Sequence, residues 1–174
     1  APTTSTLLQM AMGDAIAIAL LDRRGFSEES FHGFHPGGSL GAVLKQVEEV
    51  MHPLDALPLV DHDVALVTAL NVLSERGFGI VGVTKGEALA GVITDGDIRR
   101  YLAANADATM KSALHEATAA SLMTGGSVTL DPGMIVGEAL SILQSKRIGA
   151  AFVVAEGRPV GLVTMLRLLN AGAA

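Results

Sequence analysis

Two short segments of the sequence place polar side chains where an expected strand runs into an expected helix. Residues 91–97 read Gly-Val-Ile-Thr-Asp-Gly-Asp, and residues 161–167 read Gly-Leu-Val-Thr-Met-Leu-Arg. The N-terminus of a helix presents free backbone N–H groups and the positive end of the helix dipole, so it favours a phosphate or a carboxylate. Thr94 and Thr164 can cap these helices or bind the anion. Asp97, one turn into its helix, can accept both hydroxyls of a ribose.

The second segment departs from the first at its last position, where Arg167 stands in place of Asp97. A guanidinium has no acceptor for ribose hydroxyls, but it can clamp a carboxylate or a phosphate. Together the segments predict a ribose-type and an anion-type subsite in one shared cleft, which suits a single asymmetric anionic ligand. Two structural alternatives stay open. Thr-x-x-Asp is also a capping box, in which the acid satisfies a backbone N–H, and Arg167 can be a solvated first-turn residue.

Both segments belong to an internal repeat that aligns without a gap. A shift of 70 residues superimposes Asp61 on Asp131, Gly91 on Gly161 and many apolar positions on one another. A unit this short cannot bury its apolar face alone, so the two copies are expected to pack face to face, share a core and leave a ligand cleft between related edges. The fold class is therefore α/β, with two β-α-β-β-α units around a pseudo-two-fold axis.

Hydrophobic periodicity and turn residues divide each copy into an extended piece, a helix, a hairpin of two strands and a closing helix. In the first copy the expected ranges are 57–60, 64–76, 79–84, 89–94 and 96–103. In the second copy they are 127–130, 135–147, 150–155, 159–164 and 165–171. An Ala-rich connector over 104–121 separates the copies, with residues 110–119 able to form a helix.

The chain begins with a different kind of segment. A helix is expected over 7–24, stopped at Gly25, and it is apolar on most faces, which is typical of a helix inside a larger body. A loop with two histidines follows over 27–41, and a short helix over 40–47. We interpret the leading helix as the last helix of a domain that the chain does not contain, so the sequence reads as a piece of a longer protein.

Composition excludes several classes of function. The formal charge is −6 with no basic stripe and only 3% aromatic residues, which argues against a nucleic-acid partner. No unbroken apolar run reaches the roughly 18 residues of a membrane span, so no membrane association is predicted and a cytoplasmic location is the default. The sequence has no cysteine, and His52, His62 and His115 lack metal-ligand spacing, so no metal site or cofactor is predicted.

Over residues 48–172 the two copies resemble a tandem of CBS domains, a Bateman module. The resemblance rests on Val50-Met51-His52 and Leu122-Met123-Thr124 at the starts, and on the two segments described above at the ends. In that family the corresponding residues contact nucleotides, so the resemblance implies ligand-binding roles for Thr94, Asp97 and Thr164, with Arg167 as the departure from the pattern.

The segment before the repeats resembles the end of the sugar isomerase (SIS) domain of arabinose 5-phosphate isomerases, through residues 2–6, 12–15, 25–26 and 35–41. That resemblance implies a parent enzyme that interconverts ribulose 5-phosphate and arabinose 5-phosphate on the way to the lipopolysaccharide sugar Kdo. It makes His35 a catalytic residue of the full-length enzyme only. The expected domains are an SIS remnant over 1–46 and repeats over 47–108 and 109–174.

Two functions follow from these resemblances, and direct catalysis by this chain is not expected. The first is regulation, with an adenine nucleotide or the nucleotide sugar CMP-Kdo as the effector. The second is subunit pairing by a module that has no physiological ligand. A homodimer of CBS pairs, within a tetrameric parent enzyme, is expected in either case.

Overall fold

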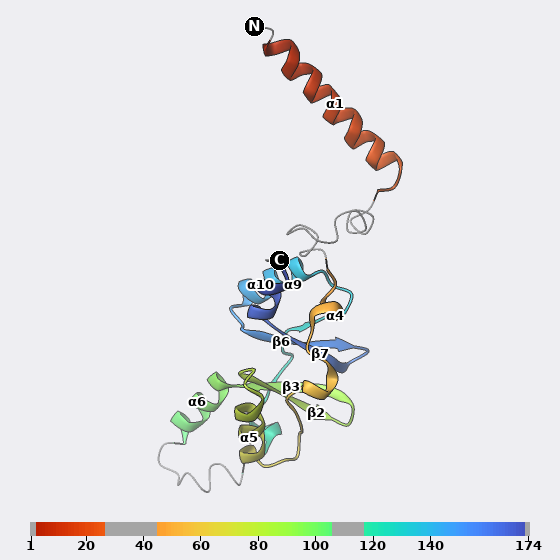
Figure 1. Cartoon of the computed structure of the whole chain (residues 1–174). Helices are drawn as coiled ribbons and strands as arrows, with labels where there is room; N and C mark the ends of the chain where they lie inside the picture. The colour runs from red at the N-terminus through yellow and green to blue at the C-terminus, as the bar shows by residue number, and fades with distance from the viewer. Residues whose placement is uncertain (1–2, 27–44, 106–116, 173–174) are drawn as a thin grey trace.

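The structure is a computed structural model that describes residues 3–26, 45–105 and 117–172. The two repeats each form a small sheet with helices on its outer side, and the sheets face one another (Figure 1). One sheet has the strand order β1-β2-β3-β4 and the other β5-β6-β7. The predicted α/β pair of repeats is confirmed.

The elements within the repeats lie within about two residues of the predicted ranges. The first repeat contains β1 (Leu59–Asp61), α5 (Leu66–Arg76), β2 (Ile80–Lys85), β3 (Ala88–Thr94) and α6 (Asp95–Ala104), preceded by the 3-10 helix η1 (Leu54–Ala56). The second contains β5 (Thr129–Leu130), α9 (Val136–Lys146), β6 (Ala150–Ala155), β7 (Arg158–Thr164) and α10 (Met165–Gly172). In each repeat the first strand pairs parallel to the second, and the second and third form an antiparallel hairpin.

The segments that lead into the repeats are exchanged between them. Helix α4 (Val47–Val50) precedes the first repeat, yet Val47 is fully buried in the core of the second. His52 exchanges backbone hydrogen bonds with Leu162 of β7, at 2.8 and 3.2 Å. In the same way α8 (Ala119–Leu122) and β4 (Thr124–Gly125) precede the second repeat but pack on the first, where β4 pairs with β3. Each repeat is therefore completed by the other's leading segment.

The glycines that open the two segments let the incoming segments approach the strands closely. A Cβ at Gly91 would lie 2.7 Å from the carbonyl oxygen of Thr124, and one at Gly161 would lie 2.2 Å from Sδ of Met51. At Gly91 the obstacle is backbone, so a larger residue would push the incoming segment off the strand, whereas at Gly161 the Met51 side chain would have to move.

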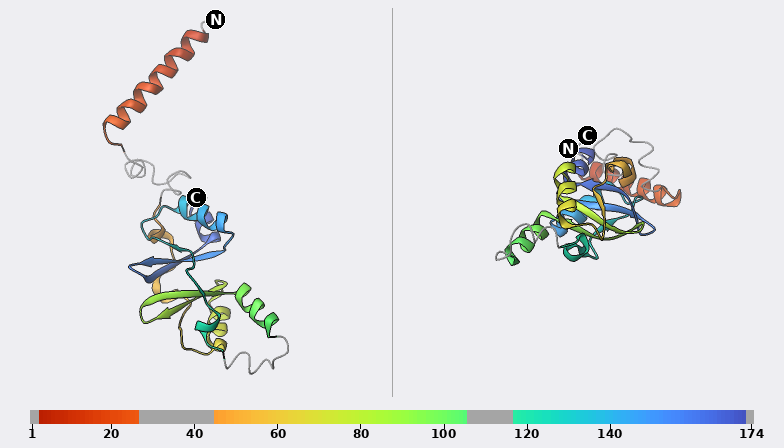
Figure 2. Two further views of the ribbon diagram at one scale, coloured as in Figure 1. Left: turned by 180° about the vertical axis from the view of Figure 1, so that it is seen from behind. Right: turned by 90° about the horizontal axis from the view of Figure 1, so that it is seen from below.

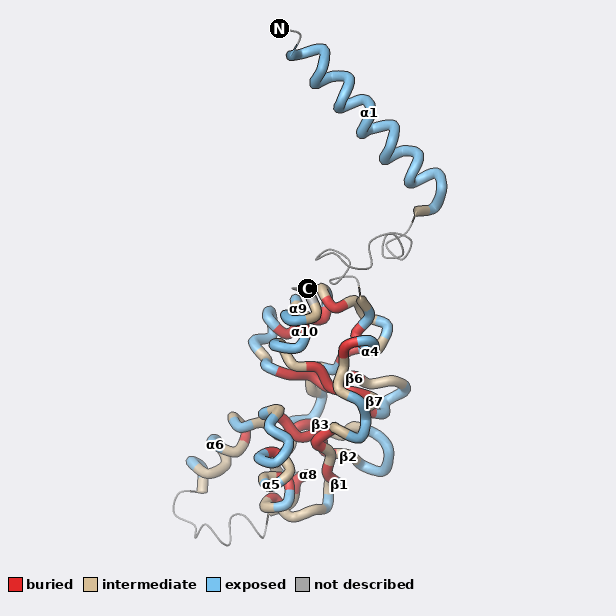
Figure 3. Tube along the Cα trace, viewed as in Figure 1, coloured by how far each residue is buried: buried red, intermediate tan, exposed pale blue. Residues whose placement is uncertain are grey.

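A separate apolar cluster joins the two sheets. It combines Leu57, Ile80 and Val92 of the first repeat with buried residues of β6 and β7, among them Phe152, which is fully buried. Buried residues lie along the central strands of both sheets (Figure 3). A Cβ at Gly82 would lie 2.8 Å from the Phe152 ring, so the sheets approach as closely as a Gly allows. This cluster holds the two sheets together.

Helix α1 (Thr3–Arg23) buries none of its residues and extends away from the repeats (Figure 2). It begins four residues before the predicted start and ends as expected at a turn in which Gly25 has φ +63°. By length and composition it could cross a membrane, which a count of unbroken apolar runs missed. Core helices of soluble proteins pass the same test, so this is weak evidence.

Two other predicted helices lie partly outside the described residues. The helix expected over 40–47 can be compared only from residue 45, and there the helix starts at Val47 and runs to Val50 instead. Of the helix expected over 110–119, the described residues begin at 117, and α8 starts only at Ala119.

Candidate functional site

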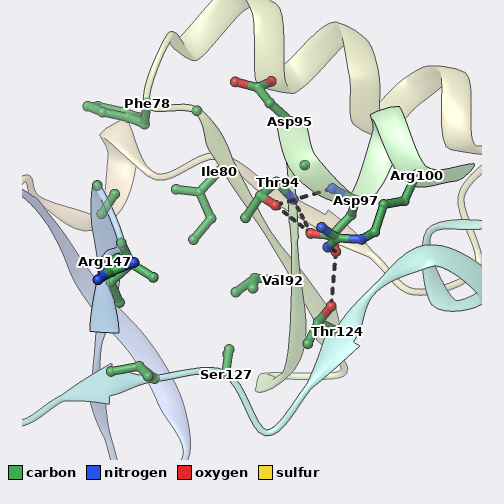
Figure 4. Close-up of a pocket in the computed structure, with 16 residues that line it drawn as sticks. Phe78, Ile80, Val92, Thr94, Asp95, Asp97, Arg100, Thr124, Ser127 and Arg147 are labelled. Carbon is green, nitrogen blue, oxygen red and sulfur yellow. Dashed lines mark hydrogen bonds and ion pairs between the residues drawn. The ribbon is translucent and has the colours of Figure 1, made fainter. Parts of the chain in front are cut away.

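A cavity of about 480 Å³, here called pocket 1, lies between the two repeats (Figure 4). One wall comes from the first repeat, with the apolar side chains of Ile80 and Val92 and the start of α6. The other comes from the second repeat, over residues 147–150, and the connection at Thr124 and residues 127–128 closes one side. Pocket 1 therefore has apolar walls with a helix N-terminus at one end.

Asp97 is the one polar or charged residue that is buried in the described part of the chain, with 7% of its surface exposed. Its Oδ2 accepts hydrogen bonds from the backbone N–H of Thr94 at 2.8 Å and from the Thr94 hydroxyl at 2.6 Å. Its Oδ1 accepts from Arg100 at 2.5 Å and from the Thr124 hydroxyl at 3.1 Å. The capping box is thus formed, and the same carboxylate lines pocket 1.

These contacts set the charge of Asp97. Burial acts to raise the pKa of this carboxyl, but the hydrogen bonds from Thr94, Arg100 and Thr124 outweigh burial and hold its pKa below the ordinary value. Asp97 is therefore an anion at neutral pH with its lone pairs occupied. Of these hydrogen-bonding partners, Arg100 has a largely exposed side chain, at 74%.

Thr164 and Arg167 line a second hollow of about 490 Å³, called pocket 2, together with Val50 and His52. The Thr164 hydroxyl accepts a hydrogen bond from the Arg167 backbone N–H at 3.2 Å, and the Arg167 guanidinium donates to the carbonyl oxygen of Val50. Burial and the Arg167 charge lower the pKa of His52, whose ring lies 4.7 Å from that of Phe78.

The expectation of one cleft shared by all four predicted residues is therefore wrong. The structure pairs Thr94 with Asp97 in pocket 1 and Thr164 with Arg167 in pocket 2, because each helix N-terminus faces the segment that enters from the other repeat. Whether any of the four binds a ligand stays a prediction. His35 lies outside the described residues.

Arg100, Thr124 and Arg147 are among the pocket 1 residues that the sequence did not predict. Arg100 lies three positions after Asp97 on a helix, and this spacing is a signal for an ion pair that could have been used. Thr124 reaches Asp97 only through the pairing of β4 with β3, which has no local signal. Arg147 joins the pocket from the end of α9, also without a local signal.

Among the described residues, one group could hold a metal ion by distance alone. Ligand atoms of Asp61, His62 and Asp63 lie within 4.8 Å of one another at the turn after β1. The histidine spacing considered in the sequence overlooked these adjacent residues. Asp61 and Asp63 are exposed, and exposed acidic groups of this kind are common without a metal.

Two α/β repeats that face one another, each completed by the leading segment of the other, define a tandem repeat module, and the family comparison agrees with this architecture. The CBS domain model matches residues 47–104 and 119–174. The chain belongs to the CBS domain family.

Among curated proteins, it is 42% identical over 175 residues to the arabinose 5-phosphate isomerase KdsD of Pseudomonas aeruginosa, and 36% identical over 174 residues to KdsD of Escherichia coli K12. These alignments cover 99% of this chain but only 52% and 51% of the relatives, so the chain spans about half of their length.

Solved structures with the same fold include two with bound nucleotides. CBSX2 of Arabidopsis thaliana in complex with AMP has a TM-score of 0.63 and 21% identity, over 74% of this chain and 96% of that one. The CBS domain of a bacterial CNNM/CorC family Mg²⁺ transporter in complex with ATP has a TM-score of 0.62 and 22% identity, over 77% and 91%. At such identities the similarity shows the fold.

Proposed function

We propose that the chain is the regulatory, ligand-binding part of an arabinose 5-phosphate isomerase, and that pocket 1 binds a nucleotide or a nucleotide sugar. The observation that carries this proposal is a carboxylate that is held at a helix N-terminus and lines a cavity with apolar walls. A ribose diol fits the carboxylate, a flat base fits the walls, and an anionic group fits the cations at the margin. The complexes of related folds with AMP and ATP support this ligand class.

The similarity to the KdsD isomerases extends the proposal to a whole enzyme of which this chain would be one part. The isomerase domain would end within residues 1–46 of this chain, so that His35 lies in its active site, and it would interconvert ribulose 5-phosphate and arabinose 5-phosphate for Kdo synthesis in the cytoplasm. Ligand binding shifts such an enzyme between states only if the ligand's affinity differs between them. CMP-Kdo and adenine nucleotides are the candidate effectors, because each combines a ribose with an anionic group.

Isothermal titration calorimetry of this chain with AMP, ATP and CMP-Kdo tests the proposal. We expect at least one of them to bind and Asp97→Ala to weaken that binding at least tenfold, since the diol loses its acceptor. Asp55→Ala is the matched control, because it removes an exposed carboxylate that lines neither pocket. The proposal would be contradicted if none of the three ligands gave a heat of binding, or if Asp97→Ala bound the ligand as tightly as the unmodified chain.

A second candidate function is subunit pairing, and exposed apolar side chains on α10 favour it. Leu166 is 67% exposed and Leu169 is 43% exposed on this helix. Burying such side chains between two copies of the module is favourable. Sedimentation velocity should show a dimer that dissociates when both residues are changed to Ser, and a monomeric unmodified chain would contradict this candidate.

A further inference from the structure

Arg147 has an unusual backbone conformation for its residue type. It ends α9 with φ 55°, in the left-handed region that costs an L-residue free energy and that helix ends normally assign to Gly. The equivalent position of the first repeat follows this rule, since Gly77 ends α5 with φ 68°. A Gly at position 147 would relieve the backbone but would leave no side chain there.

The conformation alone does not indicate a role. Glu156 also has a positive φ, of 51°, where the first repeat has Gly86 with φ 64°. Glu156 lies in the turn between β6 and β7 and lines neither pocket. Arg147 and Glu156 therefore share the backbone conformation, but only Arg147 lines a pocket.

The side chain of Arg147 lies at pocket 1, across the cavity from Asp97 and Arg100, with Ile80 and Val92 between them (Figure 4). Its guanidinium makes no hydrogen bond or ion pair with any other residue that the structure describes. The cavity thus has a diol acceptor on one side and an uncommitted cation on the other. A guanidinium recognises phosphate and carboxylate through paired N–H donors.

We propose that Arg147 is a specificity-determining residue that binds the anionic group of a ligand whose diol lies at Asp97. Pocket 1 then selects nucleotides over nucleosides, because only a nucleotide supplies the anion that this cation pairs with. The inference rests on the proposed function of pocket 1 and deepens it by naming the group that sets ligand choice.

Arg147→Gly tests this inference with two effects of opposite sign. We expect the melting temperature of the chain to rise by about 1–3 °C, because the backbone cost is relieved. AMP should bind roughly tenfold more weakly, as is typical for loss of a charged hydrogen-bonding partner, and adenosine should bind with unchanged affinity. Arg147→Asn should give the same binding pattern, because Asn tolerates the left-handed region and also lacks the charge.

Glu156→Gly is the matched control: it should give a similar rise in melting temperature with no change in AMP binding. Equal weakening of AMP and adenosine by the Arg147 variants would mean that Arg147 only shapes the pocket, and unchanged AMP binding would mean that it contacts no ligand. Either result overturns the inference while leaving the proposed function standing. If the unmodified chain binds neither AMP nor adenosine, an adenine nucleotide is excluded for pocket 1, and the inference falls with it.

Discussion

Replacement of Asp97 by Ala should destabilise the chain even when no ligand is present. The change removes the acceptor for two hydrogen bonds from Thr94 and one from Thr124, and it removes half of the capping box of α6. Loss of a helix cap costs about 1 kcal/mol, and loss of a hydrogen bond to a charged group about 1.5–3 kcal/mol. The ion pair with Arg100 adds little, because that side chain is mostly exposed.

The Ala variant no longer buries the carboxylate charge, which offsets part of this loss. We therefore expect the free energy of unfolding to fall by about 2–3 kcal/mol. Urea unfolding followed by circular dichroism measures the change. Arg167→Ala is the matched control at the equivalent position of the second repeat. The Arg167 side chain is exposed and donates a hydrogen bond to one carbonyl oxygen, so its removal should lower the free energy of unfolding by about 1 kcal/mol or less.

The pH dependence gives the same prediction a second readout. The pKa of Asp97 is lowered in the folded state, so the carboxylate stabilises the fold above the ordinary pKa of an Asp, and this contribution is lost as the pH falls through the lowered pKa. The gap between the unmodified chain and Asp97→Ala should be constant from about pH 7 to pH 5 and should narrow below about pH 4. A gap independent of pH, or one no larger than for Arg167→Ala, would refute the reasoning.

Three further changes test the packing. Gly91→Ala should lower the free energy of unfolding in urea by about 1–3 kcal/mol, because the added Cβ would meet a backbone oxygen. At Gly149 an added Cβ has no atom within 4 Å, so Gly149→Ala should be nearly neutral. Equal costs for the two variants would contradict this prediction. Phe152→Ala should cost about 3–5 kcal/mol, and a cost below 1 kcal/mol would mean that the sheets are not held by this ring. Deletion of residues 1–26 should leave the melting temperature unchanged, because α1 has no buried residue. It should also reduce the association of chains measured by light scattering, because α1 exposes large apolar side chains. A lower melting temperature would show that α1 packs on the repeats.

The elements of the repeats could be predicted because their signals are local. The helix over 66–76 carries apolar residues at helical spacing and ends at Gly77, and the hairpins are marked by Gly86 and Gly157. Duplication gave each pattern twice, so a weak signal in one copy was supported by the other. The capping box at Thr94 was also readable from the sequence, because the Thr and the Asp stand three residues apart.

The exchange of leading segments could not be predicted in this way. Val47 is buried against residues more than 80 positions later in the chain, and the pairing of β4 with β3 involves only two residues of each strand. Neither contact produces a periodic pattern in the sequence. The error about a single shared cleft follows directly, since the position of each pocket depends on which segment enters beside which helix. Arg147 was missed for the same reason, because it reaches pocket 1 only when the repeats are stacked.

The two pockets have the same construction but differ in the charge of one residue in the first turn of the helix. At the entering segment, Thr124 stands beside β3 in pocket 1 and His52 stands beside β7 in pocket 2. At the helix, Asp97 of pocket 1 corresponds to Arg167 of pocket 2, so a cation replaces the acceptor at this position. Burial, and after it the Arg167 charge, lowers the pKa of the neighbouring His52. A guanidinium cannot accept hydrogen bonds from a diol. We therefore expect calorimetry to give one bound ribose ligand per chain. A stoichiometry of two would show that pocket 2 also binds the ligand, although it has Arg167 where pocket 1 has Asp97.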